Sequence, residues 1–273
     1  MDPQTLTTKM LQLNQAIPQV FGLKQGEQLP KVINNVYSNY TFYREYPVEL
    51  QEKIGLVSCV EVKPSPIHGQ GLFATKDIHK GQIPTFYPVD GYRHSSGTWE
   101  AFQPSKNMEC SATFTLLDVN LDDYALNLNQ DYKITGFPEG KVNHPDFYLG
   151  HMINDGIGQT FDFTKTLSTE RSAIRNGIAR YLLQFGEKIN CAFNYDPSLG
   201  LIIIIALKEI HVGDELLTSY LIPYWVEKEL RLAEKNGVSE DIRKRFKSTY
   251  LQERTKFLSN PNFPSYIMPD VFF

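Results

Sequence analysis

Two glycines near the start of a β-rich stretch could hold a nucleotide. Residues 69–74 read GQGLFA, so Gly69 and Gly71 form the Gly-x-Gly start of a dinucleotide-binding fingerprint. That fingerprint binds NAD when a strand precedes it and a helix opens on it, because the pyrophosphate lies at the helix N-terminus. A strand is predicted before it, at 57–62, but a Lys-Gly turn and two prolines follow it, and these favour two short strands. The sequence context therefore does not support an NAD site.

The histidines and cysteines do not form a metal-binding pattern. Cys59, Cys110 and Cys191 are far apart, with no Cys-x-x-Cys pair, no zinc cluster and no disulfide framework. His151 and Asp155 lack the His-x-Asp spacing that begins a facial-triad iron site, and no second histidine falls at metal spacing. We predict a protein without a metal and, from the unpaired cysteines, a reducing intracellular compartment, nucleus or cytoplasm.

Length and composition indicate a folded protein with no general affinity for nucleic acid or membranes. The 273 residues suit one large domain with additions or two modest ones, and 41% hydrophobic residues allow a substantial core. The formal charge of −4 does not favour an anionic partner, and the basic run at 243–247 is interpreted as a solvated helix face. The longest apolar run, 201–207, is too short to span a bilayer, and the first residues do not resemble a signal peptide.

The elements that position these residues are mostly short strands between helical ends. Residues 4–54 look largely helical, 91–112 are polar and turn-rich, and 129–131 is a predicted hairpin turn. Strands are predicted near 57–62, 71–75, 83–87, 113–117, 123–128, 131–135, 189–195 and 201–210. The chain lacks regular strand–helix alternation, so we predict a mainly β fold with helical additions, of the α+β class.

Two helical regions stand out in the second half of the chain. A helix is predicted at 168–185, with an apolar stripe made of Ala173, Ile174, Ile178, Tyr181, Leu182 and Phe185. A charged helical region runs from Pro223 to about residue 258 and is broken near Asn236 and Gly237. The tail after it is interrupted by prolines and rich in aromatic residues.

Four stretches, taken in order, carry a family resemblance. They are GQGLFATKDIHKGQ (69–82), TFYPVDG (85–91), LGHMINDG (149–156) followed by NCAFNY (190–195), and IIIIALKEIHVGDELLTSY (202–220). Together they resemble the SET-domain lysine methyltransferases over most of the chain. The resemblance implies a SET-domain fold of short-strand sheets with a pseudoknot-like C-terminal segment. It also implies a helical N-terminal extension (1–55), a SET domain (56–225), and a C-terminal helical segment with the aromatic tail (226–273).

The chain departs from the family pattern in two places. The family's Arg-Phe-Ile-Asn-His segment is here HMIND, so His151 and Asp155 stand where the family has Arg and His. The few residues that normally separate this segment from Asn-Cys become about 35, which gives an insert at about 157–188. We expect this insert to be a peripheral lobe that shapes substrate choice and leaves cofactor binding alone. The zinc segments that some members carry are absent from the sequence.

The resemblance implies S-adenosylmethionine as cofactor and a lysine amine as methyl acceptor. The backbone of Gly69, Gln70 and Gly71 would lie against the methionine part, where a side chain would block the close approach. Asn154 would accept a hydrogen bond from the cofactor's amino group, and Asp155 beside it would favour that cationic end. The alternative for these last two residues is an Asn-Asp-Gly turn, which is a common loop signal.

Aromatic residues are the implied catalytic groups. Tyr220 follows the last predicted strand, and its hydroxyl could contact the transferring methyl and orient the amine. Tyr87 would line the same channel. Tyr224 and Trp225 would cover the adenine, or they could equally form core for the C-terminal helix. Thr218 stands where the family has Phe or Tyr two positions before the terminal Tyr, so the number of methyl groups added stays open.

Two functions of different classes follow from these residues. The first is a protein-lysine methyltransferase whose partner is a protein with an accessible lysine, with a histone tail as the first candidate by analogy. The second is a catalytically inactive SET-fold module that binds a protein or chromatin partner. The resemblance at Gly69, Gly71, Asn154 and Tyr220 favours the first. An iron-dependent oxygenase is a third class, for which the sequence lacks the metal ligands.

Overall fold

The computed structural model describes residues 35–40, 42–43, 48–50, 58–94, 100–101, 125–127, 132–136, 147–157, 171–196 and 198–259. Most of the predicted N-terminal helical region, the predicted strand at 113–117, the turn at 129–131 and the aromatic tail lie outside these residues. The chain divides into two compact units. We call Gln19–Asn154 with Asn190–Leu216 the sheet unit, and Met1–Pro18, Asp155–Ile189 and Leu217–Phe273 the helical unit.

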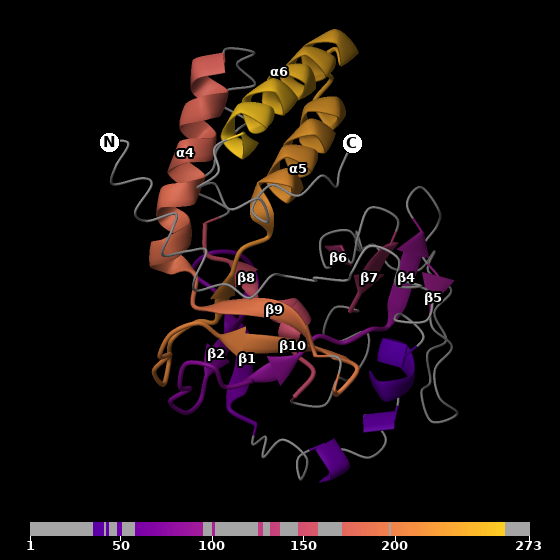
Figure 1. The fold of residues 1–273 in the computed structure, drawn as a ribbon, viewed down its shortest axis with the longest axis vertical. Coiled ribbons are helices and arrows are strands. Elements are labelled where there is room, and N and C mark those ends of the chain that lie inside the picture. The colour runs from indigo at the N-terminus through magenta and orange to yellow at the C-terminus, as the bar shows by residue number, and fades with distance from the viewer. Residues whose placement is uncertain are drawn as a thin grey trace. The chain divides into compact units, whose positions relative to one another are not determined.

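The sheet unit is built from small antiparallel sheets (Figure 1). The first pairs β1 (Val60–Pro64) with β2 (Gln70–Ala74). The second has the order β3 (Thr85–Phe86), β10 (Leu201–Ala206), β9 (Cys191–Asp196). The third has the order β5 (Glu100–Ala101), β4 (Gly91–His94), β7 (Tyr132–Thr135), β6 (Ala125–Asn127). A short 3₁₀ helix, η3 (Gly150–Met152), belongs to the same unit. These sheets confirm the predicted α+β class.

The apolar run of β10 forms the centre of the sheet-unit core. Five of its six residues are buried, as expected for a strand with neighbours on both sides, β3 and β9. Phe86, Tyr148 and Leu72 are completely buried in the same cluster. The rings of Phe86 and Tyr148 lie with centroids 5.6 Å apart. This core holds the strands that carry the glycine-rich and Asn-Cys segments.

One sequence expectation for the sheet unit was wrong. β4 and β5 lie within residues 91–112, which the composition predicted as turn-rich. β4 pairs in register with β7, from Gly91 opposite Thr135 to His94 opposite Tyr132. Cross-strand pairing therefore overrides the weak local preference of these residues, as is common for β structure.

The helical unit contains three described helices and a short strand pair. β8 (Asn154–Asp155) pairs with β11 (Leu217–Thr218), and the second residue of β8, Asp155, is the first one of this segment in the helical unit. The Gly156 amide donates to the Thr218 carbonyl. The helices are α4 (Arg171–Lys188), α5 (Leu221–Lys235) and α6 (Glu240–Leu258). α6 contacts both α4 and α5 (Figure 1).

The sequence predicted these helices well. Ile174, Ile178 and Tyr181 of the predicted stripe are buried, which confirms the inward face of α4. The break between α5 and α6 falls at the predicted Asn236–Gly237, where Gly237 has a φ of 75° that favours glycine. None of the described helices is long and apolar enough to cross a membrane.

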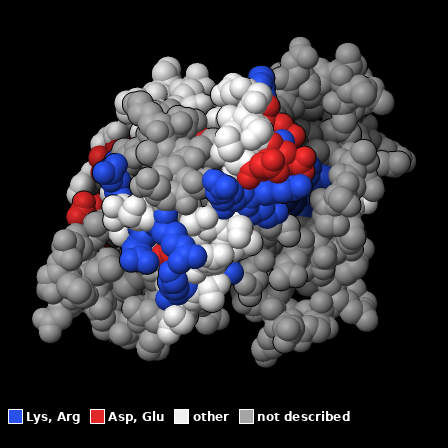
Figure 2. Space-filling model, turned by 90° about the horizontal axis from the view of Figure 1, so that it is seen from above, with Lys and Arg blue, Asp and Glu red and all other residues white. Residues whose placement is uncertain are grey.

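Ion pairs join the helices of this unit. The carboxylate of Glu253 on α6 is fully buried and lies 2.9 Å from Arg175 of α4 and 2.6 Å from Lys256. The Lys256 ammonium and the Arg175 guanidinium hold the pKa of Glu253 below its ordinary value. Exposed pairs also occur, including Lys244 with Glu240 one turn earlier on α6. Figure 2, which is seen from above the view of Figure 1, shows Lys and Arg side chains directly beside Asp and Glu side chains.

Candidate functional site

Asn154 is the most constrained polar side chain among the predicted cofactor residues. Its amide nitrogen Nδ2 donates to the carbonyl oxygens of His68 (3.1 Å) and Gln70 (3.0 Å) and to Oε1 of Glu215 (2.9 Å). Carbonyls and carboxylates only accept, so this network fixes which end of the amide carries the nitrogen. Among the described residues, Oδ1 receives no hydrogen bond, and the side chain therefore presents one acceptor.

Glu215 links Asn154 to the glycine-rich turn. Its Oε2 accepts from the hydroxyl of Ser65 at 3.0 Å, and its backbone carbonyl accepts from Nδ2 of Asn190 at 2.8 Å. A Cβ placed on Gly71 would lie 2.1 Å from Oε1 of Glu215 and 3.0 Å from Cβ of Ser65. A side chain at position 71 would therefore displace the carboxylate that holds Asn154.

Gly69 shapes the turn before β2. Its φ of 52° lies in the left-handed region, and its carbonyl accepts from the Ser65 amide at 2.8 Å. The Ser65 hydroxyl also accepts from the Ile67 amide at 2.9 Å. The structure thus brings the predicted Gly69-Gln70-Gly71 segment together with Asn154, through the Gln70 carbonyl and Glu215.

Asp155, the next residue, serves the helical unit. Its carboxylate is buried, and Oδ1 accepts from the Ile157 amide at 2.7 Å. Oδ2 accepts from the Tyr220 amide at 2.9 Å and from indole Nε1 of Trp225 at 2.7 Å. Amide, indole and hydroxyl donors thus compensate the buried charge of this carboxylate.

The insert supplies another donor to the same oxygen. Tyr181 of α4 is fully buried, and its hydroxyl lies 3.4 Å from Oδ2 of Asp155 and forms a short hydrogen bond with Oγ of Ser219. Burial, followed by the nearby Asp155 charge, raises the pKa of Tyr181 well above its ordinary value. The phenol therefore stays protonated and can donate throughout the neutral range.

Tyr220 lies at a constrained bend between β11 and α5. It precedes the first residue of α5, and its own φ of −80° and ψ of −3° are near-helical. Leu221 has a φ of 71°, a left-handed conformation that costs a non-glycine residue about 1 kcal/mol or more. The Leu221 amide donates to Oγ of Ser219 at 3.1 Å. Hydrogen bonds on both sides of Tyr220 thus hold a strained backbone.

The predicted aromatic residues after this bend form a cluster. The rings of Tyr220 and Trp225 are nearly parallel, with centroids 6.3 Å apart and an interplanar angle of 14°. Tyr224 meets Tyr220 edge-on at 4.9 Å and Trp225 edge-on at 5.2 Å. The ammonium of Lys228 lies 5.2 Å from the Trp225 ring centroid, within the range of a cation–π contact. Whether Tyr224 and Trp225 cover an adenine stays a prediction.

Tyr87 lies in the sheet unit, whereas Tyr220 lies in the helical unit. Tyr87 is buried, its hydroxyl accepts from the Gly136 amide at 3.3 Å, and its ring meets Phe193 edge-on. Burial raises the pKa of Tyr87 far above its ordinary value. The common channel of these two tyrosines stays a prediction.

Four residues of these networks were not predicted from the sequence. Glu215 accepts from Asn154 and is itself bonded by Ser65, whereas Tyr181 bonds both Asp155 and Ser219. Glu215 stood inside the quoted GDEL motif, which was the available signal. Tyr181 was assigned to an apolar stripe, where the pattern reports the buried ring and says nothing of the hydroxyl.

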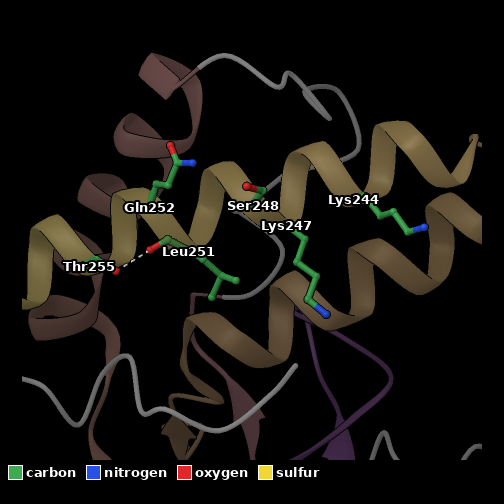
Figure 3. Close-up of a pocket in the computed structure, with 6 residues that line it drawn as sticks. All are labelled: Lys244, Lys247, Ser248, Leu251, Gln252 and Thr255. Atoms are coloured by element: carbon green, nitrogen blue, oxygen red, sulfur yellow. Dashed lines mark hydrogen bonds between the residues drawn. The ribbon is translucent and has the colours of Figure 1, made fainter.

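A surface hollow of about 400 Å³ lies along α6 (Figure 3). Its described lining is one face of this helix, made of Lys244, Lys247, Ser248, Leu251, Gln252 and Thr255, none of which is a predicted site residue. Within the described ranges, no three His, Cys, Asp or Glu side chains gather as a metal site.

The comparison with protein families identifies the chain. The family model of the SET domain matches residues 69–221, which is more than half of the chain. The chain therefore belongs to the SET domain family, as its four motifs predicted, and it has the SET-domain fold. This family consists generally of methyltransferases that use S-adenosylmethionine.

The solved structures that match the chain include two whose descriptions name a methyltransferase. One is a Plasmodium falciparum protein described as a histone methyltransferase, with 15% identity and a TM-score of 0.30 over 62% of this chain and 99% of that chain. The other is the methyltransferase domain of human PR domain-containing protein 2, with 17% identity and a TM-score of 0.30 over 62% of this chain and 83% of that domain. No curated protein matches the chain.

Proposed function

We propose that this SET-domain protein is an S-adenosylmethionine-dependent protein-lysine N-methyltransferase. The observation that carries the proposal is the orientation of Asn154, whose nitrogen has three protein acceptors and whose oxygen has no donor among the described residues. A fixed acceptor of this kind fits the ammonium group of the cofactor's methionine part. Gly69 and Gln70 are exposed residues, the Gln70 carbonyl accepts from Asn154, and their backbone would flank that part.

The bound cofactor would supply a methyl group on a sulfonium, which is already activated for in-line attack. The protein then has to align the lysine amine, exclude water and keep the amine neutral. A lysine has a reference pKa near 10.4, and a dry channel beside a cation would lower it. No strong general base is required for this step. The proposed site residues, which are tyrosines, an asparagine and backbone groups, therefore suit this reaction.

Tyr220 is the proposed catalytic residue. Its ring is held by Trp225 and Tyr224, and its backbone amide is bonded to Asp155, so its hydroxyl would have a defined position against the amine and the moving methyl. Tyr87 is proposed to line the lysine channel, and Trp225 to contribute to the adenine side of the cofactor site. Asp155 would contribute to cofactor binding by ordering this segment.

The experiment combines calorimetry with radiolabelled methyl transfer. Purified protein without added metal is titrated with S-adenosylmethionine, and labelled cofactor is then offered with a panel of histones and with total cell protein. One-site binding together with label on lysine supports the proposal. Absence of binding heat in a protein that carries tight zinc or iron would overturn it. Histones come first by analogy with the family, and with them a nuclear location; other proteins in either the nucleus or the cytoplasm are covered by the cell extract.

The inactive-module hypothesis makes a different prediction for the same experiment. The observation that supports this hypothesis is that His151 and Asp155 replace the family's Arg and His. An inactive module would bind a peptide or chromatin partner and transfer no label under any substrate condition. The two functions are thus separated by transfer in the presence of saturating cofactor.

A further inference from the structure

We infer that Tyr181, supplied by the insert, is a positioning residue that fixes Tyr220 through Asp155 and Ser219. The insert and the replacement of the family's His by Asp155 are the two departures of this chain from the family pattern. In the structure they meet at one atom, because the Tyr181 hydroxyl lies 3.4 Å from Oδ2 of Asp155. The two departures therefore belong to one hydrogen-bond network. This inference rests on the proposed function of Tyr220 and deepens it.

The Tyr181 hydroxyl contacts two residues that adjoin or bind Tyr220. It bonds Ser219, the residue before Tyr220, as well as Asp155, which binds the Tyr220 amide. The Ser219 hydroxyl in turn accepts from the Leu221 amide. Every link flanks or touches the backbone of Tyr220. Loss of the Tyr181 hydroxyl would release both of its contacts at once.

The position of Leu221 explains why such a restraint is useful. A leucine with a φ of 71° relaxes to a commoner conformation unless its surroundings hold it. Relaxation at this bend would rotate the Tyr220 side chain relative to the Trp225 ring beside it. The hydrogen bonds from Asp155 and Ser219 oppose that change. The insert thus acts on the catalytic segment, in addition to any effect on substrate choice.

The restraint is sterically anchored by α4. Tyr181 is completely buried, and Ile174 and Ile178 on the same face are buried as well. On the other helix of the pair, Glu253 of α6 binds Arg175 of α4. A rigid helix in contact with a second helix is a suitable support for a side chain that must place another within a fraction of an ångström.

The test is Tyr181→Phe, which keeps the ring and removes the hydroxyl. Tyr250→Phe is the matched control, because Tyr250 is another buried tyrosine of the helical unit, on α6. Asp155→Asn and the double variant Tyr181→Phe/Asp155→Asn complete a cycle. Steady-state methyl transfer gives kcat and KM, and calorimetry gives the Kd of S-adenosylmethionine. A second readout, independent of activity, is the NMR resonance of the Trp225 indole N–H in isotope-labelled protein, with Trp99 replaced by Phe in every variant.

We expect Tyr181→Phe to lower kcat about 10- to 100-fold, because misplacement of a catalytic group by a fraction of an ångström is costly. KM and Kd should stay within about twofold, and the indole resonance should shift, because its acceptor Asp155 loses a neighbouring donor. The double variant should be little worse than Asp155→Asn alone, since both act through one network. Tyr250→Phe should change neither readout.

Two outcomes would overturn the inference. One is an unchanged kcat with an unmoved indole resonance in folded Tyr181→Phe, and the other is additive effects of Tyr181→Phe and Asp155→Asn. A wild-type protein that transfers no methyl group to any substrate contradicts the proposed function instead. In that case the indole resonance alone decides whether Tyr181 orders the Asp155 segment.

Discussion

Asn154 and Asp155 are neighbours in the chain, but each is fixed by a different kind of partner. Asn154 belongs to the sheet unit and is held by three acceptors, two of them backbone carbonyls. Asp155 belongs to the helical unit and is held by amide, indole and hydroxyl donors. An amide held by its nitrogen still offers an oxygen, whereas a carboxylate held by four donors has few acceptor sites left.

This difference separates a residue suited to a ligand from one suited to a structural junction. The sheet unit arranges short strands and a tight turn around the acceptor oxygen of Asn154, whose nitrogen is held in part by Glu215 next to Gly71. The helical unit instead ties an aromatic cluster and a strained bend to one buried carboxylate. Cofactor binding should therefore be most sensitive in the first region, and turnover most sensitive in the second. Substitutions in each region can break that assignment.

The largest effect is expected for Tyr220→Phe. Removal of the hydroxyl should lower methyl transfer roughly 100- to 1,000-fold, the usual loss for one well-placed polar group at a reacting centre. S-adenosylmethionine binding should change little, since the hydroxyl is proposed to act mainly in the transition state. The ring remains, so its packing on Trp225 and the stability should be preserved. Radiolabelled transfer and calorimetry on the same preparation measure both quantities.

Thr218→Ala is the control for this segment. Thr218 lies two residues earlier, in β11, and is buried. Its replacement should alter the number of methyl groups or the substrate preference more than the rate, which mass spectrometry of the product can measure. Near-normal turnover of Tyr220→Phe on a confirmed substrate would contradict the catalytic role of Tyr220, and Tyr87→Phe would then be the variant to test.

The second effect in size is expected for Gly71→Val, in the sheet unit. The added side chain would overlap the Glu215 carboxylate and so release Asn154 from one of its three acceptors. If Asn154 then loses its orientation, a charge-assisted hydrogen bond to the cofactor's amino group is lost. That bond is worth about 1.5–3 kcal/mol, so the Kd should rise about 10- to 100-fold. From the sequence alone, Gly71→Val is expected to abolish binding by direct overlap with the cofactor; the structure adds the displacement of Glu215.

Gly213→Ala provides the comparison for Gly71→Val. Gly213 has a φ of 86° in the same unit, and a Cβ on it would meet no atom within 4 Å. This variant should cost about 1 kcal/mol of stability for the left-handed backbone and leave cofactor binding intact. Equal losses of binding in both variants would mean that backbone strain, rather than the position of Glu215, controls the site.

The sequence predicted the elements of both regions more fully than their side-chain networks. Periodicity and turn residues predicted the strand that carries Gly71, the strand that follows Asn190, and the helix that carries Tyr181. The motif order identified Asn154, Asp155 and Tyr220 because each stands at a fixed place in the family pattern. Local patterns of this kind report burial and backbone shape.

The partners within each network could not be predicted in the same way. Ser65, Asn154 and Glu215 come from three separate segments that only the folded sheet unit brings together. The use of Asp155 depends on Tyr181, which reaches it from α4 inside an insert without counterpart in the family pattern. Hydrogen-bond direction depends on three-dimensional geometry, and neither composition nor spacing specifies it.

The smallest effect is expected for Glu253→Gln, which asks whether charge or packing holds α4 in the helical unit. The pKa of Glu253 is lowered by Lys256 and Arg175, so its charged form stabilises the fold above the unfolded pKa, and this contribution is lost as pH falls through the folded value. Glu253→Gln should therefore be less stable than wild type near pH 7, and the difference should shrink below the ordinary carboxyl pKa of 4.5. The effect should be small, because the side chains of Arg175 and Lys256 are 56% and 53% exposed and stay hydrated when the carboxylate is removed. Denaturant unfolding at several pH values measures it, with exposed Glu240→Gln as the control that should change little. If the difference in unfolding free energy between Glu253→Gln and wild type does not depend on pH, Glu253 acts through packing and hydrogen bonding. The ion pair between Glu253 and Arg175 would then not contribute to holding α4, which carries Tyr181.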